Sequence, residues 1–168
     1  MKAIYQITIA HNRYDSRIYQ RIASSLAKAN LDITLIVCDG LGDETINNLY
    51  IKDLGNINFF LLGHGIKQFK IYIALKKVNS ILHFHEPILL PLAIILRIFG
   101  NTVVFDMHEN LHLQIITKTW RVPKYFKLII SRIYRIIEDS FLKIINGITV
   151  PQPIMVDMYK SQNTNIIS

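Results

Sequence analysis

Short apolar runs alternate with longer amphipathic segments along the chain. The apolar runs predict β-strands, because they are short and rich in β-branched side chains. They cover residues 3–10, 33–38, 81–85, 102–107 and 147–150. Helical spacing of apolar residues marks 16–30, 66–79, 87–99 and 124–145. We also expect one or two strands in 45–62, a loop over 110–123, a short helix over 151–160 and a last strand over 165–167.

This alternation predicts an α/β fold. Strands separated by helices form a parallel sheet, so we expect a single Rossmann-like, doubly wound sheet with helices on both faces. The length of 168 residues fits one domain, residues 1–168. Apolar residues make up 51% of the chain and charged residues 18%, which excludes a disordered chain and predicts a substantial core.

The charge balance and the single cysteine limit the partners and the cellular location that we expect. A net charge of +7 favours an acidic partner, such as an anionic membrane surface or a phosphorylated ligand. Nucleic acid is not expected, because no nucleic-acid-binding motif is present. Cys38 alone excludes a disulfide framework, and no signal peptide opens the sequence, so we expect a cytoplasmic protein. The longest apolar run ends at Arg97, short of the roughly 20 residues that a membrane span needs.

Polar side chains gather where three predicted strands end. The clusters are His11, Arg13, Asp15 and Arg17 after the first strand, His85 and Glu86 after the strand at 81–85, and Asp106, His108 and Glu109 after the strand at 102–107. The carboxyl ends of parallel strands share one edge of a sheet, where ligands bind in open α/β folds. The sequence therefore predicts a binding site at that edge.

The first cluster precedes a helix, and a helix N-terminus suits an anion because its backbone N–H groups are free. Arg13 and Arg17 would add charge-assisted hydrogen bonds to a phosphate. The alternative is structural. In that case Asp15 or Ser16 caps the helix and Arg17 pairs with Asp15 or faces solvent.

One histidine pair and one Asp–His pair allow different chemistry. His83 and His85 are two residues apart on a strand, so they share a face and, with nearby carboxylates, could bind zinc or iron. Alternatively, His83 is a hydrogen-bonded core residue. Asp106 and His108 are also two apart, and a carboxylate beside an imidazole serves a general base or holds a sugar hydroxyl.

The long helix at 124–145 has two interpretations. Its apolar face contains Phe126, Ile129, Ile130, Ile133, Ile136 and Ile137, with Lys124, Arg132 and Arg135 opposite. In the first interpretation this apolar face packs on the sheet and the basic face is solvated. In the second the helix lies on an anionic membrane, because seven bases (Lys118, Arg121, Lys124, Lys127, Arg132, Arg135, Lys143) stand against two acids between residues 117 and 147, and Trp120 suits an interface.

With these clusters in this order, the sequence resembles the N-terminal domain of family 4 glycosyltransferases, and most closely a bacterial subgroup that acts in surface polysaccharide synthesis. The resemblance is carried by HNRYDSRIYQRIASSLAKANLDITLIV, ILHFHEPILLPLAIILRIFGNTVVFDMHEN, the long basic helix and ITVPQPIMVDMY. It covers nearly the whole chain. Glu86 stands where the subgroup more often has Asp, and Asn30 where it commonly has Gly.

The resemblance implies a GT-B architecture, in which two Rossmann-like domains face a cleft, and a retaining transfer from a nucleotide-sugar without a metal cofactor. This chain would be the acceptor-side domain, with the donor-binding domain absent, so we expect little or no transfer by the chain alone. By position, the resemblance makes His108 catalytic and assigns substrate contacts to His11, Arg13, Asp15, Arg17, His85, Glu86, Asp106 and Glu109. The expected partners are a glycan or lipid-linked acceptor and a separate donor-binding subunit, at the inner face of the cytoplasmic membrane.

Two other functions fit the same residues. The first is a binding module without catalysis, or a truncated remnant, that docks on a membrane or on another transferase. The second is a metal-dependent hydrolase that uses His83, His85 and His108. Elemental analysis of the purified protein distinguishes the hydrolase from the other two.

Overall fold

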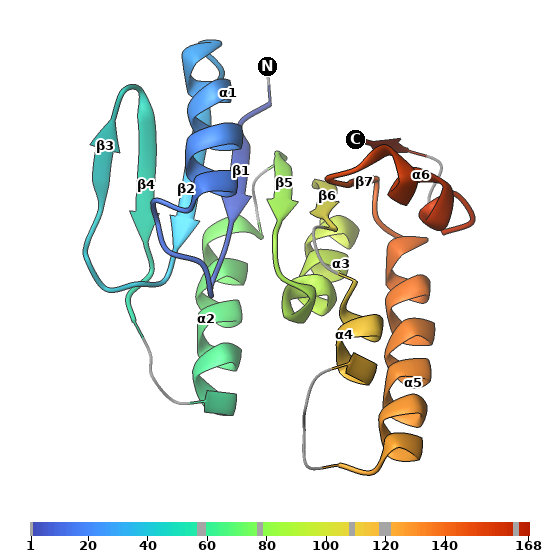
Figure 1. The fold of residues 1–168 in the computed structure, drawn as a ribbon. Helices are drawn as coiled ribbons and strands as arrows, with labels where there is room; N and C mark the ends of the chain where they lie inside the picture. The colour runs from blue at the N-terminus through green and yellow to red at the C-terminus, as the bar shows by residue number, and fades with distance from the viewer. Residues whose placement is uncertain (1, 57–59, 77–78, 108–109, 118–121, 163–164) are drawn as a thin grey trace.

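A computed structural model describes residues 2–56, 60–76, 79–107, 110–117, 122–162 and 165–168 of the chain (Figure 1). Its centre is an eight-stranded sheet in the order β3-β4-β2-β1-β5-β6-β7-β8. The strands are β1 (Ile4–Ile7), β2 (Ile33–Val37), β3 (Glu44–Ile46), β4 (Leu49–Asp53), β5 (Ile81–Phe84), β6 (Thr102–Asp106), β7 (Gly147–Thr149) and β8 (Ile166–Ile167). All neighbouring strands are parallel except β3, which pairs antiparallel with β4 at one edge of the sheet.

Helical segments connect the parallel strands and cover both faces of the sheet. They are η1 (π-helix, Ser16–Ala23), α1 (Ser24–Lys28), α2 (Phe60–Leu75), η2 (3₁₀, Pro87–Leu89), α3 (Leu90–Ile98), α4 (Leu111–Thr117), α5 (Lys124–Leu142) and α6 (Pro153–Tyr159). One core cluster packs η1 and α1 on β2 and β4, through residues such as Ile18 and Leu35. A larger cluster packs α2, α3 and the end of α5 on the other face, around Phe84 and Phe105. The fold is therefore the predicted doubly wound α/β sheet.

Local sequence signals fix the ends of several elements. The side chain of Asp15 accepts hydrogen bonds from the backbone N–H groups of Arg17 (2.8 Å) and Ile18 (2.9 Å), so the predicted cap is confirmed. After α3, Gly100 has φ +89°, a conformation that ends a helix and favours glycine. Asn30 has φ +56° after α1, and asparagine is among the few residues that tolerate this region.

Two predicted boundaries are wrong. Residues 110–123 were expected to form a loop, but Leu111–Thr117 form α4, which packs beside α5. The segment is too short for its periodicity to stand out, and the neighbouring helix stabilises it. The helix predicted from residue 66 begins earlier, at Phe60. Glycines at 63 and 65 obscure the helical pattern in the sequence without preventing the helix.

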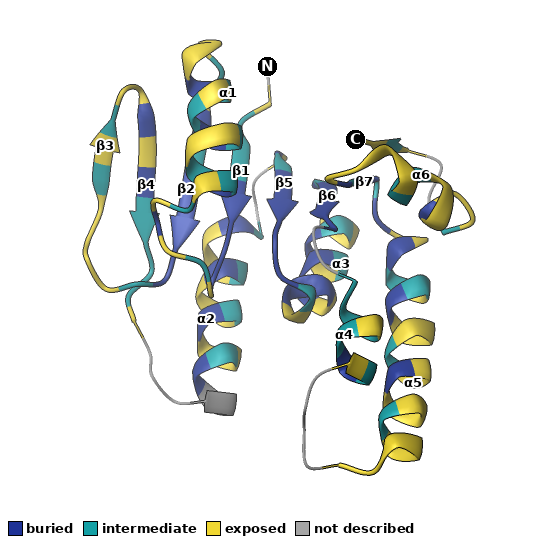
Figure 2. Cartoon of the chain, in the orientation of Figure 1, coloured by how far each residue is buried: buried dark blue, intermediate teal, exposed yellow. Residues whose placement is uncertain are grey.

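The packing of α5 contradicts the first interpretation of that helix. Phe126, Ile129 and Ile133 on its apolar face are exposed, whereas Ser131 and Glu138 face the protein. Figure 2 shows this pattern as a mostly exposed helix with a few buried positions. In the described part of the chain, no helix is both long enough and apolar enough to cross a bilayer.

Candidate functional site

The order of the strands reverses at β1, in the middle of the sheet. From β1 the chain runs to β2 on one side, and it later returns to β5 on the other. Glu86 follows β5 at this point, and its Oε1 accepts the hydroxyl of Thr8 and the backbone N–H groups of Ile9 and Ala10, both at 3.2 Å. Such switch points are where open α/β sheets bind ligands.

The second carboxylate oxygen of Glu86 is unusual. Glu86 is buried, and its Oε2 has no hydrogen-bond partner among the described residues. Buried polar atoms are nearly always hydrogen-bonded, because an unpaired one loses its hydration without replacement. Oε2 is therefore a buried hydrogen-bond acceptor without a partner among the described residues.

Asp106 joins three elements at the same edge. Its Oδ1 accepts from the Nη2 of Arg17 (2.5 Å) and from the Oγ1 of Thr149 (2.9 Å), and its Oδ2 accepts from the Nε of Arg17 (2.8 Å). The Nδ1 of His85 lies 3.1 Å from Oδ2, and the Nε2 of His85 lies 2.7 Å from the Oε1 of Gln6. We call the set Gln6, Arg17, His83, His85, Asp106 and Thr149 the Asp106 network.

The two histidines of the Asp106 network share a face, as the spacing predicted. Their ring centroids are 4.7 Å apart, and the Nε2 of His83 lies 3.1 Å from the Oγ1 of Thr149. Burial, followed by the nearby His85, lowers the pKa of His83 to about 3. His83 is therefore a neutral, hydrogen-bonded core residue, which was the structural alternative.

His11 and Asp15 lie next to the position of Glu86. The Nδ1 of His11 is 3.8 Å from the Oδ2 of Asp15, and its Nε2 is 3.9 Å from the Oε1 of Glu86. Burial raises the pKa of Asp15, but the backbone N–H groups of Ile18 and Arg17 lower it further, so the net pKa is below its usual value. The structure thus brings His11, Asp15, Arg17, His85, Glu86 and Asp106 to one edge of the sheet.

Arg13 points to a different place. Its Nε and Nη2 contact the carboxylate of Asp39 at 2.7 and 2.6 Å, and its Nη1 lies 3.3 Å from Glu44. Hydrogen bonds from this guanidinium hold the pKa of Asp39 below its usual range. Because only 3% of Arg13 is exposed, its described contacts anchor the loops after β1 and β2.

The remaining predicted residues cannot be placed in the site. His108 and Glu109 lie outside the described residues, as do Lys118, Trp120 and Arg121. The structure adds Gln6, Thr8 and Thr149, which sequence analysis did not select. Their signal was a polar side chain inside or beside an otherwise apolar strand.

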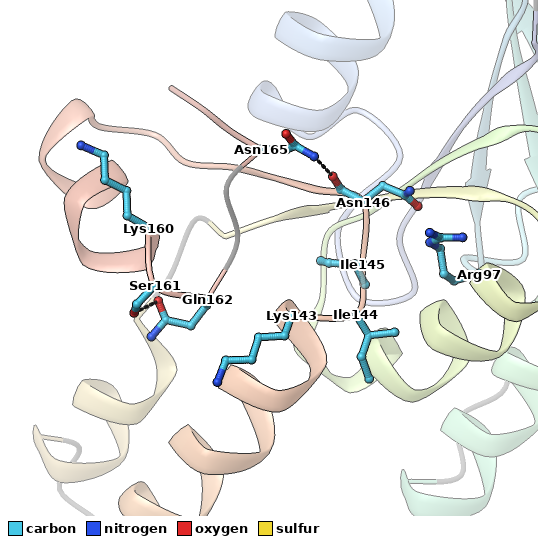
Figure 3. A pocket seen from close by; sticks show the side chains of 9 residues that line it. All are labelled: Arg97, Lys143, Ile144, Ile145, Asn146, Lys160, Ser161, Gln162 and Asn165. Atoms are coloured by element: carbon cyan, nitrogen blue, oxygen red, sulfur yellow. Dashed lines mark hydrogen bonds between the residues drawn. The ribbon is translucent and has the colours of Figure 1, made fainter.

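An open pocket of about 360 Å³ adjoins the Asp106 network, lined by Arg17, Arg21, Ile22, His83, Asp106, Thr149, Val150, Pro151, Ile167 and Ser168. A different pocket of about 430 Å³ lies at the opposite edge, near the end of α5 (Figure 3). The side chains of Lys143 and Lys160 in that pocket point away from each other, so their charges do not converge on one ligand position.

The described residues were also compared with the needs of a metal ion. Among them, no group of three His, Cys, Asp or Glu side chains is arranged to hold a metal. Both ring nitrogens of His85 already have protein partners. A metal site built on His83, His85 and His108 would depend on His108, which lies outside the described residues.

Comparisons with known proteins support the fold. The chain is similar to the crystal structure of an α,α-trehalose 6-phosphate synthase from Burkholderia multivorans, with a TM-score of 0.53 and 11% sequence identity. The match covers 96% of this chain and 43% of that protein, so the chain spans less than half of its length. No family model matches the chain, and neither does any curated protein.

Proposed function

We propose that these 168 residues form the acceptor-side half of a glycosyl-transfer site. The observation that carries the proposal is Glu86, a buried carboxylate at the switch point of the sheet whose Oε2 has no hydrogen-bond partner among the described residues. Carboxylates and amides recognise sugars by accepting hydrogen bonds from their hydroxyl groups. A carboxylate that the fold already holds in position needs no reorganisation when the sugar binds.

The fold supports the same function. Nearly all of the chain aligns with part of a trehalose 6-phosphate synthase, a protein whose name describes the assembly of a sugar phosphate. The aligned part is 43% of that protein. In our proposal a second half, outside these 168 residues, binds the nucleotide-sugar, and the cleft between the halves excludes water during transfer.

Each residue at the edge has a role in this proposal. Glu86 accepts a hydroxyl of the acceptor sugar, and His11 stands beside it. Asp106 is a positioning residue, since it is fully covered and holds Arg17 and His85 in place. His108 follows Asp106 closely in sequence, and the family resemblance makes it the catalytic residue, with Glu109 in support.

The finer parts of the proposal come from the resemblance. They are a retaining mechanism, no metal cofactor, a lipid-linked glycan as acceptor in surface polysaccharide synthesis, and a cytoplasmic location. Replacing His108 by Ala in a complex with the donor-binding half should abolish transfer and leave the fold intact. Unchanged transfer would remove His108 from the site.

A binding experiment tests the acceptor site directly. Purified chain is titrated with short oligosaccharides and with water-soluble lipid-linked sugar analogues, while its melting temperature and heat of binding are recorded. We expect Glu86→Gln to weaken binding about tenfold or more, because one hydrogen bond to a charged group is lost. Arg21→Ala, an exposed change in the wall of the pocket beside Asp106, gives a second variant that leaves the core untouched.

The control is Asp157→Asn, an exposed carboxylate on α6 paired only with Lys160 among the described contacts. It should bind acceptor as the unmodified chain does. Nucleotide-sugars supplied together with an acceptor should give no robust turnover with this chain alone. Efficient transfer by the chain alone would contradict the assignment of these residues to the acceptor side.

A further inference from the structure

Helix α5 has the reverse of the usual arrangement of polar and apolar residues. Its described inward positions include Ser131, whose Oγ donates to the carbonyl oxygen of His112 (2.8 Å), and Glu138, which accepts from the hydroxyl of Tyr134 (2.8 Å). Both Ser131 and Glu138 are buried. The protein thus buries a hydroxyl and a carboxylate on this helix and leaves its isoleucines exposed.

The exposed side chains form one continuous stripe. At 100° per residue they fall within one broad face opposite Glu138, and each is between 44% and 60% exposed. They are Phe126, Ile129, Ile130, Ile133, Ile136 and Ile137, which we call the α5 stripe. At a rise of about 1.5 Å per residue, the 19-residue helix is about 28 Å long. Soluble surfaces rarely carry a contiguous apolar patch of this kind unless it binds something.

Basic side chains lie along the margin of the α5 stripe. Arg132 and Lys143 are exposed and border the stripe on the helical projection, whereas the exposed Lys124 and Arg135 lie on the opposite face. The acids of the helix do not balance them, because Glu138 is buried and Asp139 is half-buried beside Arg135, at 3.9 Å. Tyr125 is also exposed, in the first turn of α5, with its ring centroid 4.2 Å from that of Phe126.

We propose that the α5 stripe binds the surface of an anionic lipid bilayer, with α5 lying in the interface. The isoleucines enter the boundary between headgroups and acyl chains, and the adjacent bases contact the anionic headgroups. An apolar face with a basic margin is the pattern of interfacial helices. The net charge of +7 adds a long-range attraction to the same surface.

The charge pattern favours a membrane over a second copy of the chain. A symmetric dimer through the α5 stripe would bring Arg132 and its neighbouring bases close to their own copies, which repel each other. A bilayer with anionic lipids instead pairs each base with a headgroup. The inference is independent of the proposed glycosyl transfer, because lipid binding can be measured without substrate.

Vesicle flotation tests the proposal. The purified chain is mixed with vesicles of equal parts phosphatidylglycerol and phosphatidylcholine, and with vesicles of phosphatidylcholine alone. We expect binding to the first at least about tenfold stronger than to the second, with a decline as salt is raised, because the Debye length shortens. The triple variant Ile129→Ser, Ile133→Ser, Ile136→Ser should lose at least about tenfold in binding to the anionic vesicles.

A matched control separates the α5 stripe from general hydrophobicity. Ile88, Ile98 and Ile154 are exposed isoleucines outside α5, and replacing all three with Ser should leave vesicle binding unchanged. Circular dichroism and melting curves check that both triple variants are folded, as expected for exposed positions. Equal binding to neutral and anionic vesicles, equal loss in the control, or a solution dimer that only the α5 variant dissociates would overturn the proposal.

Discussion

At the scale of single residues, His83 links burial to acid sensitivity. Its imidazole is buried beside His85 and hydrogen-bonded to Thr149, and burial lowers its pKa to about 3. In the unfolded chain its pKa returns to about 6.5. Between these values the unfolded state binds the proton and the folded state does not, so His83 reduces stability as the pH falls below about 6.5.

Replacing His83 by Gln should remove this dependence. Glutamine can still bond to Thr149 but does not titrate. We expect the unmodified protein to lose about 2 kcal/mol more of its unfolding free energy than His83→Gln between pH 7 and pH 5, measured by urea denaturation. The other titrating groups are common to both proteins. Parallel losses in the two proteins would show that His83 is protonated in the folded state.

The sequence predicts the position of some site residues but not the direction of their side chains. The strand-end positions of Glu86 and Asp106 follow from the order of strands, because parallel strands end at one edge. The direction of Arg13 does not follow from that order. It turns towards Asp39, which lies after a different strand, and only the folded geometry shows this pairing.

At the scale of elements, α5 shows the limit of pattern analysis. Periodicity located the helix and its apolar face well, because a long amphipathic segment has a clear repeat. It could not tell which face meets the protein. That depends on partners from α4 and α6, such as the carbonyl oxygen of His112, and these contacts have no counterpart in the helix's own sequence.

Glu138 offers a test of this inward face. Burial raises the pKa of Glu138 in the folded state. Protonated Glu138 therefore stabilises the fold below its unfolded pKa of about 4.3, and this stabilisation is lost as the pH rises through the higher folded pKa. Glu138→Gln keeps an acceptor for Tyr134 without the charge. At pH 7 the free energy of unfolding of the variant should exceed that of the unmodified protein by about 1 kcal/mol. At pH 4 this difference in stability should nearly vanish.

Chemical denaturation at both pH values measures this difference. Asp157→Asn, in the exposed pair with Lys160, is the control and should change stability by less than about 0.5 kcal/mol. A variant at Glu138 that is less stable than the original at pH 7 would mean that the ionised carboxylate has a stabilising partner in the folded protein.

At the scale of the whole molecule, the sheet and α5 differ in how they are held. Strands β1, β2 and β5 have partners on both sides and core clusters on their faces. The last turn of α5 reaches the core through Leu142, and Ile145, three residues later, belongs to the same core cluster. Its first turns extend beyond the sheet, next to α4 (Figure 1). Local stability follows buried contacts, so these parts should open with different free energies.

Native-state hydrogen exchange should therefore reveal a gradient along α5. We expect the amides of β1, β2 and β5 to exchange only by global unfolding, and residues 138–142 of α5 to approach that protection. Residues 124–131 should show clearly lower protection, because Ser131 has the only buried side chain among them. Mass spectrometry of peptides from the two halves of α5 makes the comparison within one sample. Equal protection in both halves would contradict it, since the first turns would then share the stability of the core although most of their side chains are exposed.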